Sequence, residues 1–410
     1  MYHITQTDQC TGGLKITVND LLSRPIENAT VNIYENSDSG TPIYSLTTNV
    51  DGQTEPVALD APIESLSMSP GIIIPYSQYN IVVTADGYFP ITINGINIFC
   101  GILSLQNVVL PNIEGLEEIF NIGPNVLYGD YPAKIPEAEI KPITDTGEIV
   151  LNEVVVPEFI VVHDGLPNDS SAPNYYVSFP DYIKNVASSE IYPTWPEETI
   201  RANILAIISF TLNRVYTEWY RNQGYDFTIT SSTAYDHKWI NNRNIFDNIS
   251  VIVDEIFADY ISRPGIKQPI LTQYCDGRRT TCSGMSQWGS KDLGDDGLSA
   301  LEILRNYYGS DVYINTAAEV EGIPVSWPGY LLEIGSSGAP VRTIQEQLSL
   351  IRDTYSNIPS FEISGIYDEE TLLAVKKFQE IFDLNESGLV DYSTWYKISR
   401  IYVALAGLST

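Results

Sequence analysis

The chain has few histidines, few cysteines and few positive charges. Its 410 residues include 3 His, 4 Cys, and 22 Lys and Arg against 52 Asp and Glu. Protein zinc sites are assembled mainly from several His and Cys side chains, so these counts disfavour a metal centre. Four cysteines in a chain of this length also do not make a disulfide scaffold. We therefore expect no metal site and no cofactor.

The formal net charge of −30 excludes one class of partner. Nucleic acid is bound through clustered Lys and Arg, so no nucleic-acid partner is expected. A polymer of neutral sugars with short peptides remains compatible with the charge. Because acidic surfaces also simply keep proteins in solution, the charge excludes partners without identifying one.

Long apolar runs are absent as well. No stretch of about 18 apolar residues occurs, so we expect no membrane span and no membrane partner. Residues 1–6 have neither the basic nor the apolar region of a secretory signal peptide. We expect that the protein is not exported by such a signal.

The sequence patterns predict a multidomain α+β protein. Residues 1–112 show short alternating runs such as Leu14, Ile16 and Val18, separated by turn signals, which predicts an all-β sandwich. Residues 113–157 combine scattered prolines with acidic residues and read as a linker or a thin covering segment, open to proteolysis. Residues 158–318 predict a mixed α+β domain, and residues 330–410 a small helical bundle.

Three helices are expected in the central domain. The strongest signal covers residues 196–220, where Pro196 suits a first helical position and Glu197 and Glu198 meet the positive end of the helix dipole. Two further helices are expected at residues 247–261 and 299–308.

Glu190 is the residue best suited to acid–base chemistry. Tyr182, Val186 and either Ser189 or Glu190 fall on one face of a short helix that Pro193 must end, so Glu190 lies at the negative end of the helix dipole. Apolar Ile191, Tyr192 and Trp195 follow it. Both features raise the pKa of a carboxyl group, as a general acid near neutral pH requires. The alternative is a helix-end glutamate that simply faces solvent.

A loop at residues 274–288 is expected to form the facing wall of a site. Gly277 and Gly284 allow close approach of the backbone, and Ser286 and Gln287 can donate and accept hydrogen bonds. Cys275 and Cys282 form a close pair, either reduced or disulfide-bonded.

Two separated signatures resemble the SpoIID/LytB family. The first runs through Tyr182, Val186, Glu190, Ile191, Trp195, Pro196, Glu198, Ile200, Arg201 and Ala202. The second is Gly284-Met285-Ser286-Gln287-Trp288-Gly289, followed by Glu302-Ile303-Leu304-Arg305-Asn306-Tyr307-Tyr308. Many relatives carry a histidine where this chain has Thr281, and an arginine where it has Ile208. These departures put a family zinc site and the role of that arginine in doubt.

The resemblance implies a peptidoglycan lytic transglycosylase with Glu190 as catalytic acid. Such an enzyme protonates the glycosidic oxygen between N-acetylmuramic acid and N-acetylglucosamine, then uses the same residue as a base, giving a 1,6-anhydro sugar without metal. The expected substrate-binding residues are Tyr182, Tyr192, Trp195, Ser286, Gln287 and Trp288. A hydrolytic muramidase, and a non-catalytic wall-binding or amidase-enhancing protein of the LytB type, remain as alternatives.

The flanking parts carry resemblances of their own. Residues 330–410 resemble the type 1 peptidoglycan-binding domain, with Ile344, Phe378 and Trp395 among the matching positions, and the β-sandwich resembles transthyretin-like or carboxypeptidase-regulatory domains. The order of these parts resembles clostridial spore cortex-lytic enzymes of the SleC type. That implies a spore location, peptidoglycan as partner, and a zymogen activated during germination by a subtilisin-like protease, with cleavage near residues 148–150. The alternative is a permanent packing domain.

Overall fold

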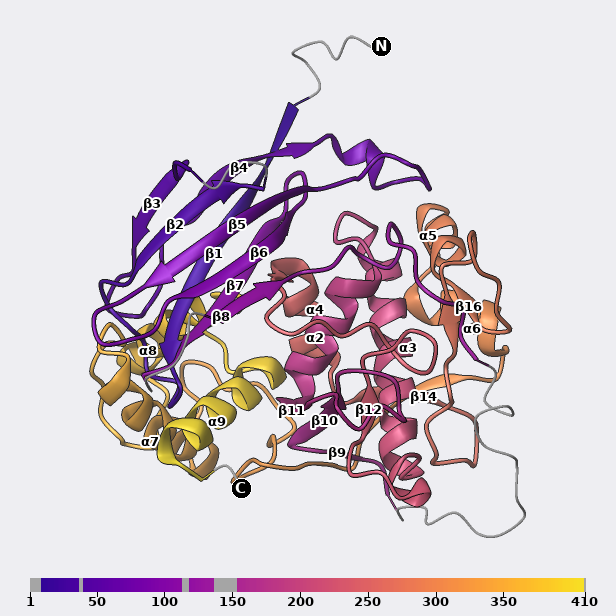
Figure 1. The fold of residues 1–410 in the computed structure, drawn as a ribbon. Coiled ribbons are helices and arrows are strands. Elements are labelled where there is room, and N and C mark those ends of the chain that lie inside the picture. Colours follow the sequence, from indigo (N-terminus) through magenta and orange to yellow (C-terminus); the bar gives the residue numbers. More distant parts are fainter. Residues whose placement is uncertain (1–8, 37–39, 113–117, 136–152, 409–410) are drawn as a thin grey trace.

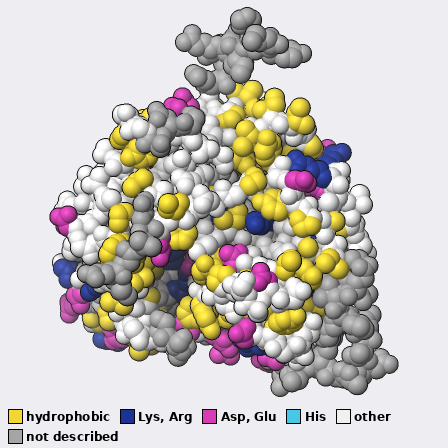
Figure 2. All heavy atoms as spheres, in the orientation of Figure 1, with side chains coloured by type: hydrophobic (Ala, Val, Ile, Leu, Met, Phe, Trp, Pro, Cys, Tyr) yellow, Lys and Arg dark blue, Asp and Glu magenta, His cyan; other side chains and the backbone are white. Residues whose placement is uncertain are grey.

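The structure, a computed structural model, describes residues 9–36, 40–112, 118–135 and 153–408. Its elements are of mixed α and β type, with strands dominating the N-terminal part and helices the C-terminal part (Figure 1). Among the described residues, no helix is both long and apolar enough to cross a membrane. On the face drawn in Figure 2, the Lys and Arg side chains stand singly or in small groups.

The N-terminal part consists of two sheets. Their strands are β1 (Gln9–Asp20), β2 (Thr30–Glu35), β3 (Tyr44–Thr47), β4 (Val57–Pro62), β5 (Ser77–Thr84), β6 (Ile91–Ile98), β7 (Leu103–Leu110) and β8 (Glu118–Asn121), with a 3-10 turn, η1, at Glu64–Leu66. One sheet has the order β3-β2-β5-β6-β8. The other has the order β13-β7-β1-β4, in which β13 (Ile245–Phe246) comes from the central part of the chain. Leu14, Ile16 and Val18 are fully buried, because alternate residues of β1 face the space between the sheets.

A disulfide joins Cys10, in β1, to Cys100, in the turn between β6 and β7. In the sequence these two cysteines carried no signal beyond their position at the ends of the first part. Both of its ends lie N-terminal to the linker.

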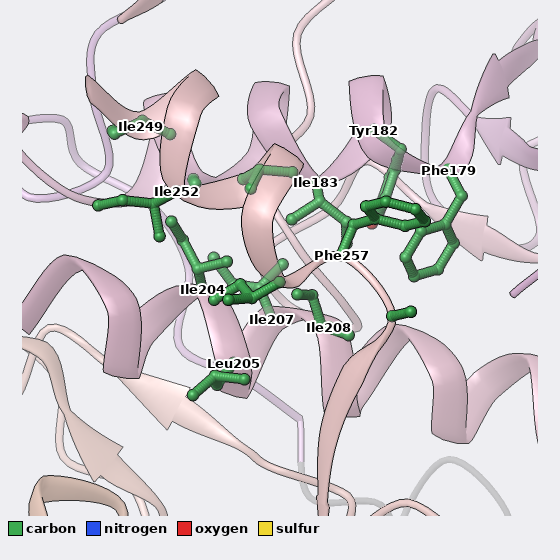
Figure 3. Packing of buried hydrophobic residues seen from close by; sticks show 14 of the residues in the cluster. Phe179, Tyr182, Ile183, Ile204, Leu205, Ile207, Ile208, Ile249, Ile252 and Phe257 are labelled. Atoms are coloured by element: carbon green, nitrogen blue, oxygen red, sulfur yellow. The ribbon is translucent and has the colours of Figure 1, made fainter. Parts of the chain in front are cut away.

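The central part surrounds three packed helices, α2 (Phe179–Glu190), α3 (Glu197–Tyr216) and α4 (Asp247–Ile256). Figure 3 shows Ile183 of α2, Ile204 and Ile208 of α3 and Ile252 of α4 meeting in one apolar layer. The remaining elements are β9 (Val155–Val156), β10 (Phe159–His163), β11 (Asn174–Ser178), η2 (Arg221–Gln223), β12 (Ile229–Thr230), β13 (Ile245–Phe246), β14 (Asp259–Ser262), β15 (Tyr274–Cys275), β16 (Met285–Ser286), α5 (Gln287–Asp295), α6 (Ala300–Tyr308), β17 (Tyr313–Thr316) and β18 (Glu319–Val320).

Two predicted helix boundaries were wrong. The helix expected at residues 247–261 ends at Ile256, and the following residues form β14, which pairs antiparallel with β17. This long-range pairing buries Tyr260 and Ile261, so tertiary contacts override the local helical pattern. The helix expected at residues 196–220 is shorter, because Pro196 is its N-cap and Thr217 its C-cap. The helix predicted at residues 299–308 is confirmed, with Ser299 as N-cap.

The C-terminal part is helical, as predicted. It comprises α7 (Ala339–Thr354), α8 (Glu369–Ile381) and α9 (Tyr392–Ala406), and its core includes Phe378 and Trp395. It lies against the N-terminal sheets in Figure 1, where the Lys15 ammonium contacts the Asp383 carboxylate at 2.7 Å. Arg400 reaches Asp181 of α2 at 3.1 Å, so this part contacts both of the others.

Candidate active site

Glu190 is the last residue of α2 and is 3% exposed. The helix ends there because Ile191 is extended and Pro193 follows. One carboxylate oxygen of Glu190, Oε1, accepts a hydrogen bond from the backbone N–H of Lys238 at 2.8 Å. The other, Oε2, accepts one from Gln287 Nε2 at 3.2 Å. The carboxyl group is thus held in one orientation by two parts of the chain that are distant in sequence.

Burial raises the pKa of Glu190 above its ordinary value. The Lys134 ammonium, the Lys238 N–H and the Gln287 amide act in the opposite direction, because each favours the charged carboxylate. Burial is the larger effect. A carboxyl group with a raised pKa keeps its proton closer to neutral pH and can donate it, which is the property a general acid needs.

Glu190 borders a cavity of about 140 Å³. The lining includes Tyr274, Asp276 and Gln287 from the loop that the sequence placed opposite Glu190. Within the described residues, the buried Tyr274 hydroxyl and the Gln287 Oε1 atom have no hydrogen-bond partner. Buried polar atoms are normally satisfied, so these two oxygens mark places where a ligand or water would bind.

The loop at residues 274–288 is built to hold Gln287 in place. Both oxygens of Asp276 accept hydrogen bonds from the loop: Oδ1 from the Thr280 N–H and hydroxyl, each at 2.9 Å, and Oδ2 from the Arg279 N–H, also at 2.9 Å. A Cβ atom at Gly284 would lie 1.7 Å from the Gln273 carbonyl oxygen, so only glycine fits. Cys275 and Cys282, left open as reduced or bonded, form a disulfide across the loop.

Residues 122–135, here called the covering segment, contribute part of the lining of the cavity. The amide of Asn125 donates to the carbonyls of Ser188 and Ile191, at 3.3 and 3.1 Å, on either side of Glu190. The backbone N–H of Val126 donates to the Ser189 carbonyl at 2.9 Å. Val126, Tyr131 and Lys134 then line the cavity themselves, so this segment occupies space in front of the candidate acid.

Lys134 places a positive charge beside Glu190. Its ammonium group lies over the rings of Phe210 and Tyr274, at 4.9 and 5.0 Å from their centroids, and donates to the Asp236 carbonyl oxygen. The group is therefore held by cation–π contacts as well as by a hydrogen bond. Lys134 was missed at the level of sequence, since a single lysine in a linker carries no signal.

Tyr182 contacts the candidate site indirectly, through His237. It is fully buried, and its hydroxyl hydrogen-bonds His237 Nδ1 at 3.1 Å. Burial lowers the pKa of His237, so its ring is neutral, and it stacks on Tyr274 with centroids 5.6 Å apart. Tyr182 does not line the cavity next to Glu190.

Three of the predicted sugar-binding residues form an aromatic cluster. Tyr192, Trp195 and Trp288 are each 3% exposed, and the two indole rings lie 5.0 Å apart. The N-terminal part covers them: Trp195 Nε1 donates to the Ser67 carbonyl at 3.0 Å, and the Phe99 ring lies 5.4 Å from that of Tyr192.

Ser286 has a local structural role. Its hydroxyl accepts the N–H of Gly289 at 2.9 Å and so caps α5, and it fills the space beside Gly277, where φ is +77°. Of the residues predicted to bind substrate, the structure brings Gln287 into contact with Glu190 and places Tyr182 and Ser286 in supporting positions.

Among the residues that the structure describes, no three His, Cys, Asp or Glu side chains lie close enough together to hold a metal ion. The sulfur atoms of Cys275 and Cys282 are both used in the disulfide.

Comparison with known proteins identifies one part of the chain. Residues 337–398 match the peptidoglycan binding domain family, as the sequence of the last part predicted. No curated protein matches the chain. This match supports a peptidoglycan-related function and association with the cell wall.

Similarity to solved structures is weak. A catechol 1,2-dioxygenase of Acinetobacter radioresistens is 15% identical with a TM-score of 0.18, over 27% of this chain and 57% of that one. A 3-chlorocatechol 1,2-dioxygenase of Rhodococcus opacus 1CP is 9% identical with a TM-score of 0.19, over 27% of this chain and 62% of that one. These scores are too low to relate the folds, so the site must be read from its own geometry.

Proposed function

We propose that the chain is a lytic transglycosylase that cleaves the glycosidic bond between N-acetylmuramic acid and N-acetylglucosamine in spore cortex peptidoglycan, with Glu190 as acid and base. The observation that carries the proposal is the environment of Glu190. A buried carboxyl group with a raised pKa, held by Gln287 and Lys238, borders a cavity with unsatisfied polar atoms. The peptidoglycan-binding match supplies the substrate class.

The reaction needs only one carboxyl group. Glu190 donates its proton to the bridging oxygen, and the resulting carboxylate then removes a proton from the muramyl 6-hydroxyl, which closes on C1. Gln287 and the Lys238 N–H stabilise the carboxylate formed between these steps. Retaining and inverting hydrolases use a second carboxylate. Of the two other carboxylates that line the cavity, Asp276 has both oxygens engaged by loop donors and Asp130 belongs to the covering segment, which favours the transglycosylase over a muramidase.

We further propose that the chain is a zymogen. The covering segment occupies the space that a glycan strand would need at Glu190, and the N-terminal sheets cover the aromatic cluster. Each disulfide joins two cysteines on the same side of the linker. After a cut between residues 135 and 153, no disulfide therefore connects the two fragments. The cleavage site expected near residues 148–150 lies outside the described residues. The spore location and the subtilisin-like protease rest on the resemblance in module order.

Digestion of decoated spore cortex with the proteolytically cleaved protein tests the proposal. Mass analysis of the released muropeptides should show anhydro ends, one water lighter than hydrolysed ends. Products that carry the extra water would make the protein a muramidase. Binding to cortex with an unchanged muropeptide profile would make it a non-catalytic wall-binding or amidase-enhancing protein.

A further inference from the structure

Arg243 is a buried cation with no anionic partner among the residues that the structure describes. It is 4% exposed, and its guanidinium donates three hydrogen bonds of 3.1 Å, to Asn244 O, Ser189 Oγ and Asn97 Oδ1. All three acceptors are neutral. Burial lowers the pKa of Arg243 to about 10, since the groups that oppose this effect are tyrosines and not carboxylates.

Such an arrangement is unusual, because buried charges are normally paired with an opposite charge. The chain has 52 acidic residues and could have supplied one. A guanidinium presents five N–H donors in a planar fork that matches the two oxygens of a carboxylate. Because the partners of Arg243 are neutral oxygens, its guanidinium group does not bind a carboxylate in this arrangement, although its geometry suits one.

Arg243 lies next to the candidate acid. Its Ser189 contact directly precedes Glu190 in α2. Tyr131 of the covering segment lines the same cavity as Glu190. The Arg243–Ser189 hydrogen bond therefore holds the guanidinium at the end of α2 that carries Glu190.

The oxygen that now faces Arg243 comes from the part expected to leave. Asn97 belongs to β6 of the N-terminal sheets, and Asn244 holds it on both sides, accepting from the Asn97 N–H at 3.2 Å and donating to its carbonyl at 3.1 Å. Departure of the sheets would remove the Asn97 amide oxygen and leave one side of the guanidinium free.

We propose that Arg243 is a carboxylate-binding site of the Glu190 groove, in which the amide oxygen of Asn97 occupies the place that a carboxylate of the wall peptide takes after activation. The identity of the ligand and the departure of Asn97 rest on the proposed function. A carboxylate bound there would orient the peptide-bearing sugar relative to Glu190, and the guanidinium would distinguish peptide-substituted strands from bare ones.

Formate binding to the full chain with Asn97→Ala tests the anion site. The substitution opens a small space beside Arg243, and formate is the smallest carboxylate that can fill it. Formate, compared with chloride at equal ionic strength, should raise the Tm of this variant saturably by about 1–3 °C and leave the Tm of the parent chain unchanged. The effect should vanish in Asn97→Ala with Arg243→Met. Asn97→Ser serves as a second variant if the alanine variant does not fold.

Equal responses to formate and chloride, or a formate response that persists without Arg243, would overturn the anion site while leaving the role of Glu190 untouched. The ligand assignment has its own test. Soluble muropeptides should bind the cleaved Glu190→Gln protein about tenfold more tightly than the same muropeptides with amidated carboxylates, and Arg243→Gln should remove the difference. Equal affinity of both forms for the protein that retains Arg243 would show that the wall peptide is not the ligand.

Discussion

Glu190 experiences two opposing influences, and single substitutions can separate them. Burial favours the protonated form, while Gln287 and the Lys238 N–H favour the carboxylate. Replacing Gln287 by Leu removes one donor to the charged form, so the pKa of Glu190 should rise further. A general acid is active while protonated, so the basic limb of the pH–activity profile of the cleaved protein should move to higher pH. A limb that moves to lower pH or stays in place would show that Gln287 does not act on the acid.

The stability of Glu190→Gln follows from the raised pKa of Glu190. In the wild type, the free energy of unfolding falls as pH rises from the pKa of the unfolded chain through that of the folded protein. The loss is about 1.4 kcal/mol for each pH unit that separates these two pKa values. A glutamine has no such loss. The variant should therefore match the wild type below about pH 4 and be at least as stable at pH 8, as thermal unfolding at both values would measure.

A rearrangement at Gln287 allows the glutamine to fit. Its Oε1 atom has no partner among the described residues, so a flipped Gln287 amide can accept from the new side-chain N–H at position 190. Marked destabilisation of Glu190→Gln at pH 8 would mean that the carboxylate is a structural group and not a poised acid.

At the scale of elements, Asn125 is one of the side chains that hold the covering segment against α2. Asn125 is fully buried and donates to the carbonyls of Ser188 and Ile191, while its own Oδ1 accepts from the Leu127 N–H at 2.9 Å. Asn125→Ala should cost about 1–3 kcal/mol through lost buried hydrogen bonds and should raise the rate of limited proteolysis within residues 122–135.

Asn121→Ala provides a matched control for this change. Asn121, at the end of β8, makes an exposed side-chain hydrogen bond with Asn94 and contacts neither carbonyl at the end of α2. If both variants are cut in the covering segment at the rate of the parent chain, Asn125 does not anchor it.

The elements that follow local patterns could be predicted from the sequence. The alternation of Leu14, Ile16 and Val18 predicted a buried strand face, and Pro193 predicted the end of the helix that carries Glu190. The strand at Asp259–Ser262 could not be predicted, because it depends on pairing with β17 more than fifty residues later. The roles of Lys134 and Arg243 could not be predicted for the same reason, since they come from contacts with residues distant in the sequence.

At the scale of the whole molecule, the aromatic cluster reports on separation of the N-terminal part. Trp195 donates to the Ser67 carbonyl and Trp288 packs on Trp195, so the cluster should gain solvent when the sheets leave. Cleavage between residues 135 and 153, followed by loss of the N-terminal fragment on a sizing column, should shift tryptophan emission to longer wavelength. Trp395, with its indole N–H bonded to Val325 O inside the C-terminal part, should not contribute.

Trp195→Phe with Trp288→Phe supplies the control, since the shift should largely disappear in that protein. An emission spectrum that does not change on separation would show that the cluster remains covered and cannot bind sugars.

The arrangement of the parts was less accessible to sequence than the parts themselves. The helical C-terminal domain was predicted from residues 330–410 alone, and residues 337–398 match the peptidoglycan binding domain family. The covering segment is held at the Glu190 cavity by hydrogen bonds between residues about 60 apart, such as Asn125 with Ile191. No periodic pattern in the sequence encodes these contacts.

The most direct test of the central claim compares the cleaved wild type with cleaved Glu190→Gln on the same cortex preparation. Both proteins should fold and bind cortex through the C-terminal domain, and only the wild type should generate new anhydro-muramyl chain ends, with the loss exceeding about a hundredfold. Comparable release of chain ends by the Gln variant would contradict the assignment of Glu190 as the proton donor.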